Sequence, residues 1–167
     1  MKPELTPMLV FIDFEFTDLA PDAKLISAGL VTQDGAASFY AELADTWQLS
    51  DANEFVIEHV LPKLEGGNRQ LTWAELQRKL KRWIENRQRP VQFISDAPSW
   101  DWPWVLRLFD FPTNWPANLA YQPVSLQTLI QEAKIDFHTL DALHSHHALK
   151  DAEANRQVWL QALMPSI

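Results

Sequence analysis

The chain has 167 residues, 47% of them hydrophobic and none of them cysteine, and its formal net charge is −8. This length and composition predict one domain over residues 1–167 with a substantial core, and they exclude disulfides and thiolate metal sites. The apolar segments near the start are too short for a signal-peptide core or a membrane span, so we expect a cytoplasmic protein.

The first third of the chain is predicted to form an antiparallel meander of three strands. Residues 8–16 are continuously apolar and β-prone apart from two acids, which indicates a buried strand. Further strands are expected over 24–32 and 36–44. The turn at Asp34 and Gly35 between these two segments is typical of a β-hairpin.

Helices are predicted to alternate with strands in the rest of the chain. A short helix is expected at 52–61, closed by Pro62. Thr72 is expected to cap the next helix and to form a capping box with Glu75. The apolar stripe of that helix is Trp73, Leu76, Leu80, Trp83 and Ile84. The remaining predictions are a strand at 91–95, helices at 101–109 (with Pro103 in the first turn), 124–132 and 147–161, and a loop at 111–123. These elements indicate a mixed α/β fold with helices on the faces of a sheet.

Carboxylates interrupt the apolar segments at three places far apart in sequence. Asp13 and Glu15 are two residues apart in the first strand, so both side chains point to one side. Asp101 follows the fourth strand, and Asp151 lies in the last helix. Carboxylates in apolar surroundings are unfavourable unless a cation or hydrogen bonds compensate them, and hard divalent ions are the usual partners of oxygen ligands. Two such ions form the standard clamp for breaking phosphodiester bonds, so the sequence predicts a metal-dependent nuclease.

For three parts of this proposed site, the residues alone leave an alternative assignment. Asp13 and Glu15 would be ordinary solvated acids if the first strand lay at an edge of the sheet. Asp96 also follows the fourth strand and competes with Asp101 as the third carboxylate. His146 and His147 compete as the general base, and on an ideal helix it is His147 that shares the face of Asp151.

With these residues the chain resembles the His-type DEDD 3′-5′ exonucleases, and within that family the small bacterial exoribonucleases of the RNase AS type. The shared features are Asp-x-Glu on the first strand, an Asp after an aromatic behind a later strand, His-x4-Asp at the last helix, the LISAGLVTQDG hairpin and HVLPKL at 59–64. The resemblance implies a ribonuclease H-like fold with a central mixed five-stranded sheet. The chain departs from many members at Phe16-Thr17-Asp18-Leu19, where they have Thr-Thr-Gly-Leu.

The resemblance also implies a site and an activity. The implied metal ligands, for two Mg²⁺ or Mn²⁺ ions, are Asp13, Glu15, Asp101 and Asp151. His146 is the implied general base, and the candidate substrate contacts are Phe16, Thr17 and Trp102. The expected reaction shortens single-stranded nucleic acid, RNA rather than DNA, from the 3′ end to 5′-mononucleotides, and a homodimer is expected. The alternatives are a DNA exonuclease, a nuclease for very short oligoribonucleotides, and a non-catalytic module that binds a partner protein.

Basic residues are concentrated in one segment. Six of the fourteen lysines and arginines lie between positions 78 and 89. Such a cluster is usually the solvated face of a helix, and the alternative is a surface that contacts substrate backbone or a second subunit. Two bound divalent ions would change the net charge from −8 to −4, which weakens the objection that an acidic chain avoids nucleic acid.

Overall fold

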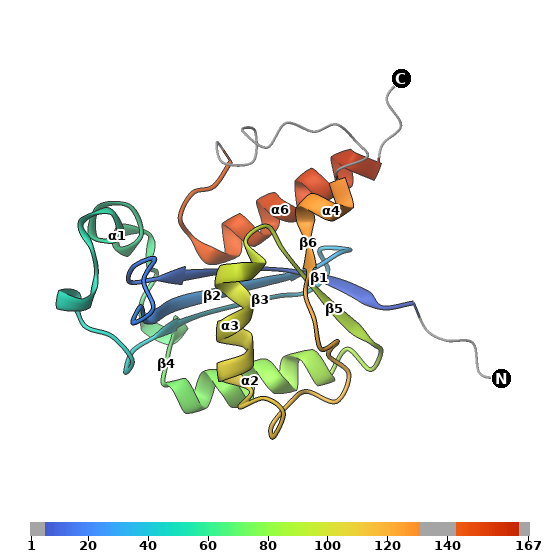
Figure 1. The fold of residues 1–167 in the computed structure, drawn as a ribbon, viewed down its shortest axis with the longest axis horizontal. Coiled ribbons are helices and arrows are strands. Elements are labelled where there is room, and N and C mark those ends of the chain that lie inside the picture. The colour runs from blue at the N-terminus through green and yellow to red at the C-terminus, as the bar shows by residue number, and fades with distance from the viewer. Residues whose placement is uncertain (1–5, 131–142, 164–167) are drawn as a thin grey trace.

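The computed structural model describes residues 6–130 and 143–163, and its centre is a six-stranded mixed sheet in the order β4-β3-β2-β1-β5-β6 (Figure 1). β1 pairs antiparallel with β2 and parallel with β5, so it is a central strand and not an edge strand. β2 pairs antiparallel with β3. The strands are β1 (Met8–Phe16), β2 (Leu25–Thr32), β3 (Ser38–Leu43), β4 (Gln70–Leu71), β5 (Val91–Ser95) and β6 (Val124–Ser125).

Helices cover both faces of this sheet. In Figure 1, α4 and α6 lie on one face, and α2 and α3 lie on the other. Among the residues that the structure describes, no helix is long and apolar enough to cross a membrane. The helices are α1 (Glu54–His59), α2 (Trp73–Glu85), α3 (Pro98–Leu108), α4 (Leu126–Ile130) and α6 (Ala148–Leu163), with short 3-10 turns at Leu49–Asp51, Leu61–Lys63 and Gly67–Arg69.

The two faces of β1 enter two different cores, because successive side chains of a strand point to opposite sides. Val10, Ile12 and Phe14 pack in the core under α2 and α3. Phe11 packs in the core under α4 and α6. Asp13 and Glu15 alternate in phase with Phe11, so the strand presents both carboxylates on the side that faces α6.

The predicted mixed α/β fold, a mixed sheet with helices on its faces, is confirmed. β1, β2, β3 and β5 lie within a residue or two of the predicted strands, and Gly35 at the hairpin turn has a φ of 71°. The capping box of α2 forms as predicted: Glu75 N–H donates to Thr72 Oγ1, and Thr72 N–H donates to Glu75 Oε2. Of the predicted stripe on α2, three residues are fully buried and the two tryptophans are partly buried.

Other predictions about the elements were wrong in detail. The sheet has six strands rather than five, since β4 and β6 are two-residue strands that the sequence pattern does not reveal. Residues 124–132 were expected to be one helix, but the first two pair with β5 and only Leu126–Ile130 are helical; 131 and 132 lie outside the described residues. α3 begins at Pro98 and not at 101, so Pro103 lies inside the helix rather than in its first turn.

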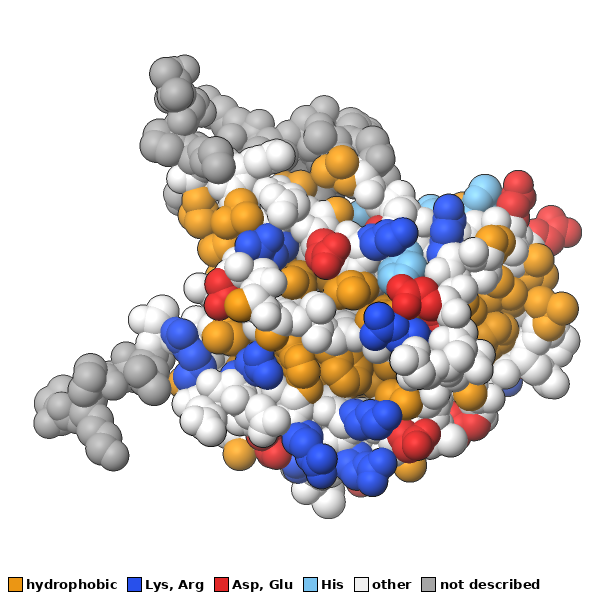
Figure 2. All heavy atoms as spheres, turned by 180° about the vertical axis from the view of Figure 1, so that it is seen from behind, with side chains coloured by type: hydrophobic (Ala, Val, Ile, Leu, Met, Phe, Trp, Pro, Cys, Tyr) orange, Lys and Arg blue, Asp and Glu red, His pale blue; other side chains and the backbone are white. Residues whose placement is uncertain are grey.

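The basic cluster is divided between different environments. Arg78, Lys79 and Arg82 are exposed on the outer side of α2, and Figure 2 shows Lys and Arg side chains gathered along the lower edge of the molecule, where α2 lies. Lys81 instead donates to the carbonyl and side-chain oxygens of Asn114. Only part of the cluster therefore forms a free basic surface.

Candidate active site

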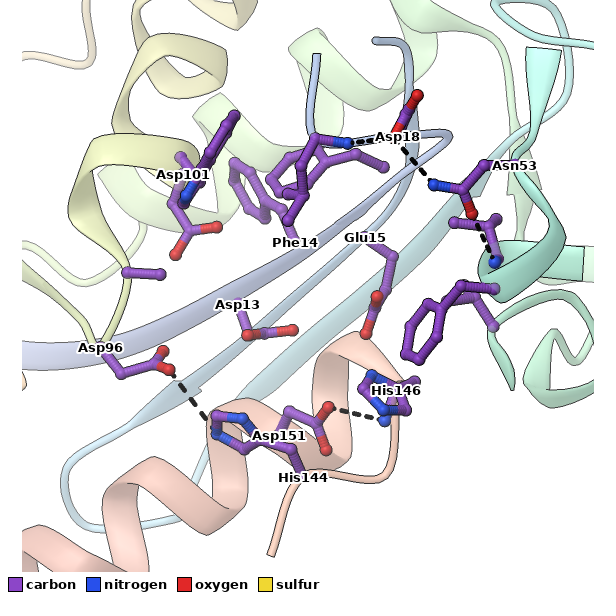
Figure 3. A pocket seen from close by; sticks show the side chains of 17 residues that line it. Asp13, Phe14, Glu15, Asp18, Asn53, Asp96, Asp101, His144, His146 and Asp151 are labelled. Carbon is purple, nitrogen blue, oxygen red and sulfur yellow. Dashed lines mark hydrogen bonds and ion pairs between the residues drawn. The ribbon is translucent and has the colours of Figure 1, made fainter. Parts of the chain in front are cut away.

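One pocket of about 540 Å³ collects the carboxylates that the sequence singled out (Figure 3). Its walls come from the second half of β1, the start of α1, the start of α3 and the segment that enters α6. The acidic and histidine side chains that line it are Asp13, Glu15, Asp18, Asp96, Asp101, His144, His146 and Asp151. The fold thus brings together all five residues of the predicted catalytic set.

Asp13 and Glu15 form the floor of the pocket, where Figure 3 shows their carboxylates between α3 and α6. Burial, followed by the charges of Asp151, Asp101 and Asp96, raises the pKa of Glu15 to about 8. Burial also raises the pKa of Asp13 well above its usual range, with Asp101 and Glu15 as the largest charge contributions. No lysine or arginine of the described residues forms an ion pair with either acid. The cluster therefore holds more negative charge than the protein itself compensates.

Asp101 and Asp96 both reach the pocket but have different surroundings. Asp101 lies in the first turn of α3, is 2% exposed, and accepts a hydrogen bond of 2.5 Å from Ser95 Oγ. Burial raises the pKa of Asp101 well above its usual range, although the Ser95 bond acts in the opposite direction. Asp96 accepts a hydrogen bond of 2.8 Å from Asn155 Nδ2 and lies 3.7 Å from His144 Nε2. Asp101 is thus held by a neutral hydroxyl, whereas Asp96 lies beside a histidine.

Asp151 organises the segment that enters α6. Its Oδ1 accepts hydrogen bonds from the backbone N–H and the hydroxyl of Ser145, and its Oδ2 accepts one from the backbone N–H of His146. His146 has a φ of 59°, in the left-handed region that side chains other than glycine seldom adopt. The bonds that the Asp151 carboxylate accepts hold the backbone in this conformation, which directs the imidazole into the pocket (Figure 3).

The two candidate histidines lie in different places. His146 lines the pocket, where its ring meets the edge of Phe55 at 5.0 Å between centroids. His147 does not line it: the ring is 4% exposed, stacks on Tyr40 at 4.4 Å and lies 3.3 Å from Glu65 Oε1. The helical argument for His147 does not apply, because α6 begins only at Ala148 and both histidines precede it.

The donor set fits a divalent cation. One ligand atom from each of Glu15, His146 and Asp151 lies within 4.8 Å of one from each of the other two. The donors are carboxylate oxygens and one imidazole nitrogen, which hard and borderline ions such as Mg²⁺ and Mn²⁺ accept. Burial lowers the pKa of His146 despite the opposing charge of Asp151, which keeps the ring neutral and able to accept a proton or bind a metal.

A clamp at the pocket rim was not foreseen from the sequence. Asp18 Oδ1 accepts hydrogen bonds from Asn53 Nδ2 and from the backbone N–H of Leu19. Asn53 Oδ1 in turn accepts from Val56 N–H and caps α1. Two walls of the pocket, the loop after β1 and the start of α1, are thereby joined. No local signal reveals this contact because the two side chains are 35 residues apart.

The three residues predicted to contact substrate lie in three different environments. Phe16 lines the pocket. Thr17 is buried, and its hydroxyl accepts a hydrogen bond from Lys24 N–H. Trp102 packs against Trp115 at 5.7 Å and does not line the pocket. The tryptophan that does reach the pocket is Trp100, which is 44% exposed.

The family model described as the 3′-5′ exoribonuclease Rv2179c-like domain matches residues 8–163. No curated protein matches the chain. Among solved structures, the Neurospora crassa Pan2 catalytic unit, which comprises a protease and a nuclease domain, is similar at 15% identity and a TM-score of 0.49. That alignment covers 96% of this chain but only 28% of the Pan2 chain. The Pan2 likeness is too weak to support an argument about function.

Proposed function

The chain belongs to the 3′-5′ exoribonuclease Rv2179c-like domain family, and from this premise we propose that it removes nucleotides from the 3′ end of single-stranded RNA in a two-metal reaction with His146 as the general base. The observation that carries this proposal is the convergence of Asp13, Glu15, Asp101, Asp151 and His146 in one pocket. In the reaction a water oxygen attacks the phosphorus of the last phosphodiester. The bond to the preceding 3′ oxygen breaks, and a 5′-mononucleotide leaves.

His146 accepts the proton of the attacking water. Its ring is neutral because burial lowers its pKa, so it has a free lone pair at neutral pH. The backbone bond to Asp151 and the edge contact with Phe55 fix the ring direction. An oriented base of this kind typically contributes about 10²–10⁴-fold to the rate.

Asp13, Glu15, Asp101 and Asp151 would hold the two Mg²⁺ or Mn²⁺ ions. When bound, such ions stabilise the negative charge that develops on the attacking and the leaving oxygen. The protein holds these carboxylates close together, no lysine or arginine of residues 6–130 and 143–163 pairs with Asp13 or Glu15, and the mutual repulsion favours metal binding. Ser95 and the Ser145–His146 backbone orient Asp101 and Asp151 by hydrogen bonds.

The test is a time course on 5′-labelled single-stranded RNA and DNA of identical sequence, with Mn²⁺ or Mg²⁺ and with EDTA. The wild type should give a ladder that shortens from the 3′ end only with metal, and faster on RNA. Asp13→Ala should abolish turnover, whereas Asp22→Ala removes an exposed acid outside the pocket and should leave turnover unchanged.

Each alternative outcome has a defined meaning. Full metal-dependent activity in Asp13→Ala would refute the site assignment. Faster hydrolysis of DNA would refute the RNA preference, and hydrolysis of very short oligomers alone would indicate an oligoribonuclease-like enzyme. Failure to bind either metal would favour a non-catalytic module.

Homodimerisation is a further part of the proposal, and it rests on the resemblance to the exoribonucleases of the RNase AS type. Light scattering combined with size exclusion should give twice the chain mass of 19.3 kDa. A mass near 19.3 kDa at micromolar concentration would contradict it.

A further inference from the structure

Three side chains form a continuous stack from the pocket to the surface of α3. The ring of Phe16, which lines the pocket, stacks on Trp104 with 6.0 Å between centroids and 19° between planes. On Trp104, the guanidinium carbon of Arg107 lies 4.7 Å from the ring centroid. The guanidinium is therefore only two layers of side chain away from the pocket.

The charge of Arg107 is exposed, and no acidic side chain in the described part of the chain pairs with it. The residue lies on the exposed side of α3, and none of the ion pairs between the described residues includes it. No side-chain hydrogen bond between described residues uses its guanidinium. Stacking on an aromatic ring fixes the guanidinium plane while its N–H groups stay available at the edge, and this geometry suits a phosphate.

Arg107 also lies on the face of α3 that begins at the pocket. Trp100, Trp104 and Arg107 are spaced at i, i+4 and i+7, so they share one face, while Asp101, Val105 and Leu108 are buried on the other. Trp100 lines the pocket and is 44% exposed. In Figure 1, α3 leads from the catalytic end of β1 toward α2. A single-stranded RNA that leaves the pocket along this face would meet an aromatic surface first and a positive charge next.

From this arrangement we propose that Arg107 binds a backbone phosphate of the RNA, upstream of the nucleotide in the pocket, and that Phe16 and Trp104 hold the guanidinium in place. This inference rests on the proposed function. A single-stranded substrate needs backbone contacts outside a pocket whose own side chains are acidic. Arg107 supplies positive charge beside that pocket without neutralising the carboxylates inside it.

The test compares Arg107→Ala with Arg107→Lys and with a matched control, Arg87→Ala. Arg87 stacks on Trp83 at the same 4.7 Å but does not line the pocket. KM and kcat are measured on a dinucleotide and on a twelve-nucleotide RNA. RNA binding is also measured by fluorescence anisotropy in the Asp13→Ala background, which reports affinity without turnover.

Arg107→Ala should raise KM for the longer RNA about tenfold, with kcat nearly unchanged and with less than about a twofold change for the dinucleotide. The slope of log affinity against log salt should fall by about 0.7, as expected for one lost phosphate contact on a single strand. Arg107→Lys should keep part of the affinity, because it keeps the charge but not the planar stack. Arg87→Ala should behave as wild type.

Two results would overturn the inference. Equal KM changes for both substrates would show that Arg107 acts on the pocket itself, and unchanged anisotropy in Arg107→Ala would show that it binds no phosphate. If either result is obtained while the wild type still degrades RNA, only this inference fails and the proposed function stands. A wild-type protein that neither binds nor degrades RNA would overturn both.

Discussion

Glu15 makes the stability of the metal-free protein depend on pH. Its folded-state pKa is raised from 4.5 to about 8 by burial and by Asp151, Asp101 and Asp96. The folded state therefore holds a proton that the unfolded state releases, and the resulting stabilisation is complete below about pH 4.5 and lost as pH rises to 8. We expect the melting temperature in EDTA to fall between pH 5 and pH 8.

Glu15→Gln tests this contribution, because it keeps the side-chain volume and removes the titration of this carboxylate. The difference in melting temperature between Glu15→Gln and wild type should grow in favour of the variant as pH rises through this window. A difference that is constant with pH would contradict the raised pKa.

The choice between His146 and His147 shows what the sequence can decide at the residue scale. The spacing to Asp151 favours His147 only if the helix already includes it, and α6 begins one residue later. The contacts that hold His147 away from the pocket come from Tyr40 and Glu65, which are distant in sequence. The motif order of the family contains this long-range information, whereas helical periodicity does not.

At the scale of single elements, Asn53 caps α1 and also binds Asp18. Asn53→Ala should cost about 1 kcal/mol of unfolding free energy, the usual effect of a lost N-cap. It should also raise KM, since α1 forms one wall of the pocket. Thr72→Ala is the matched control: it removes the cap of α2, which does not line the pocket. Urea unfolding and KM on RNA measure both variants, and an equal rise in KM would refute a role of the clamp in substrate binding.

Gly29 allows α6 to approach β2 closely. A Cβ at Gly29 would lie 2.2 Å from Ala148 C and Leu149 N, which are backbone atoms that cannot move aside without shifting the helix. Gly29→Ala should therefore cost about 1–3 kcal/mol and reduce kcat, because α6 positions Asp151. Gly67→Ala meets no atom within 4 Å but has a φ of 58°, so it should cost about 1 kcal/mol without loss of kcat. Full activity of Gly29→Ala would show that the site tolerates displacement of α6.

Element boundaries were predictable where a local signal marks them. The capping box of Thr72 and the turn at Gly35 fixed α2 and the β2–β3 hairpin, since each depends on neighbours in sequence. Val124 and Ser125 had no such signal: they read as the start of a helix, but pairing with Ile94 and Ser95 makes them a strand. α3 starts three residues before the predicted 101, because Pro98, whose fixed φ suits the first helical position, begins the helix.

At the scale of the whole molecule, a formal net charge of −8 includes the four acids of the proposed metal site. Binding of Mg²⁺ or Mn²⁺ should stabilise the folded protein, because the unfolded chain has no such site. A ligand at 100 times its Kd adds about 2.7 kcal/mol to the free energy of unfolding. Differential scanning fluorimetry should show a rise in melting temperature with metal in wild type and a smaller rise in Asp13→Ala. An equal rise in both would place metal binding elsewhere.

Asp151 has a second role through its hydrogen bonds to Ser145 and His146. The carboxylate proposed to bind metal is also the group that folds the loop carrying the proposed base. A single substitution at position 151 therefore removes two functions together, and a second substitution at 146 then has little left to remove. Mutations at the two positions should be strongly epistatic, and a lineage that lost Asp151 would be expected to lose selection on His146 as well. Metal affinity and the orientation of the proposed base would thus be gained or lost together.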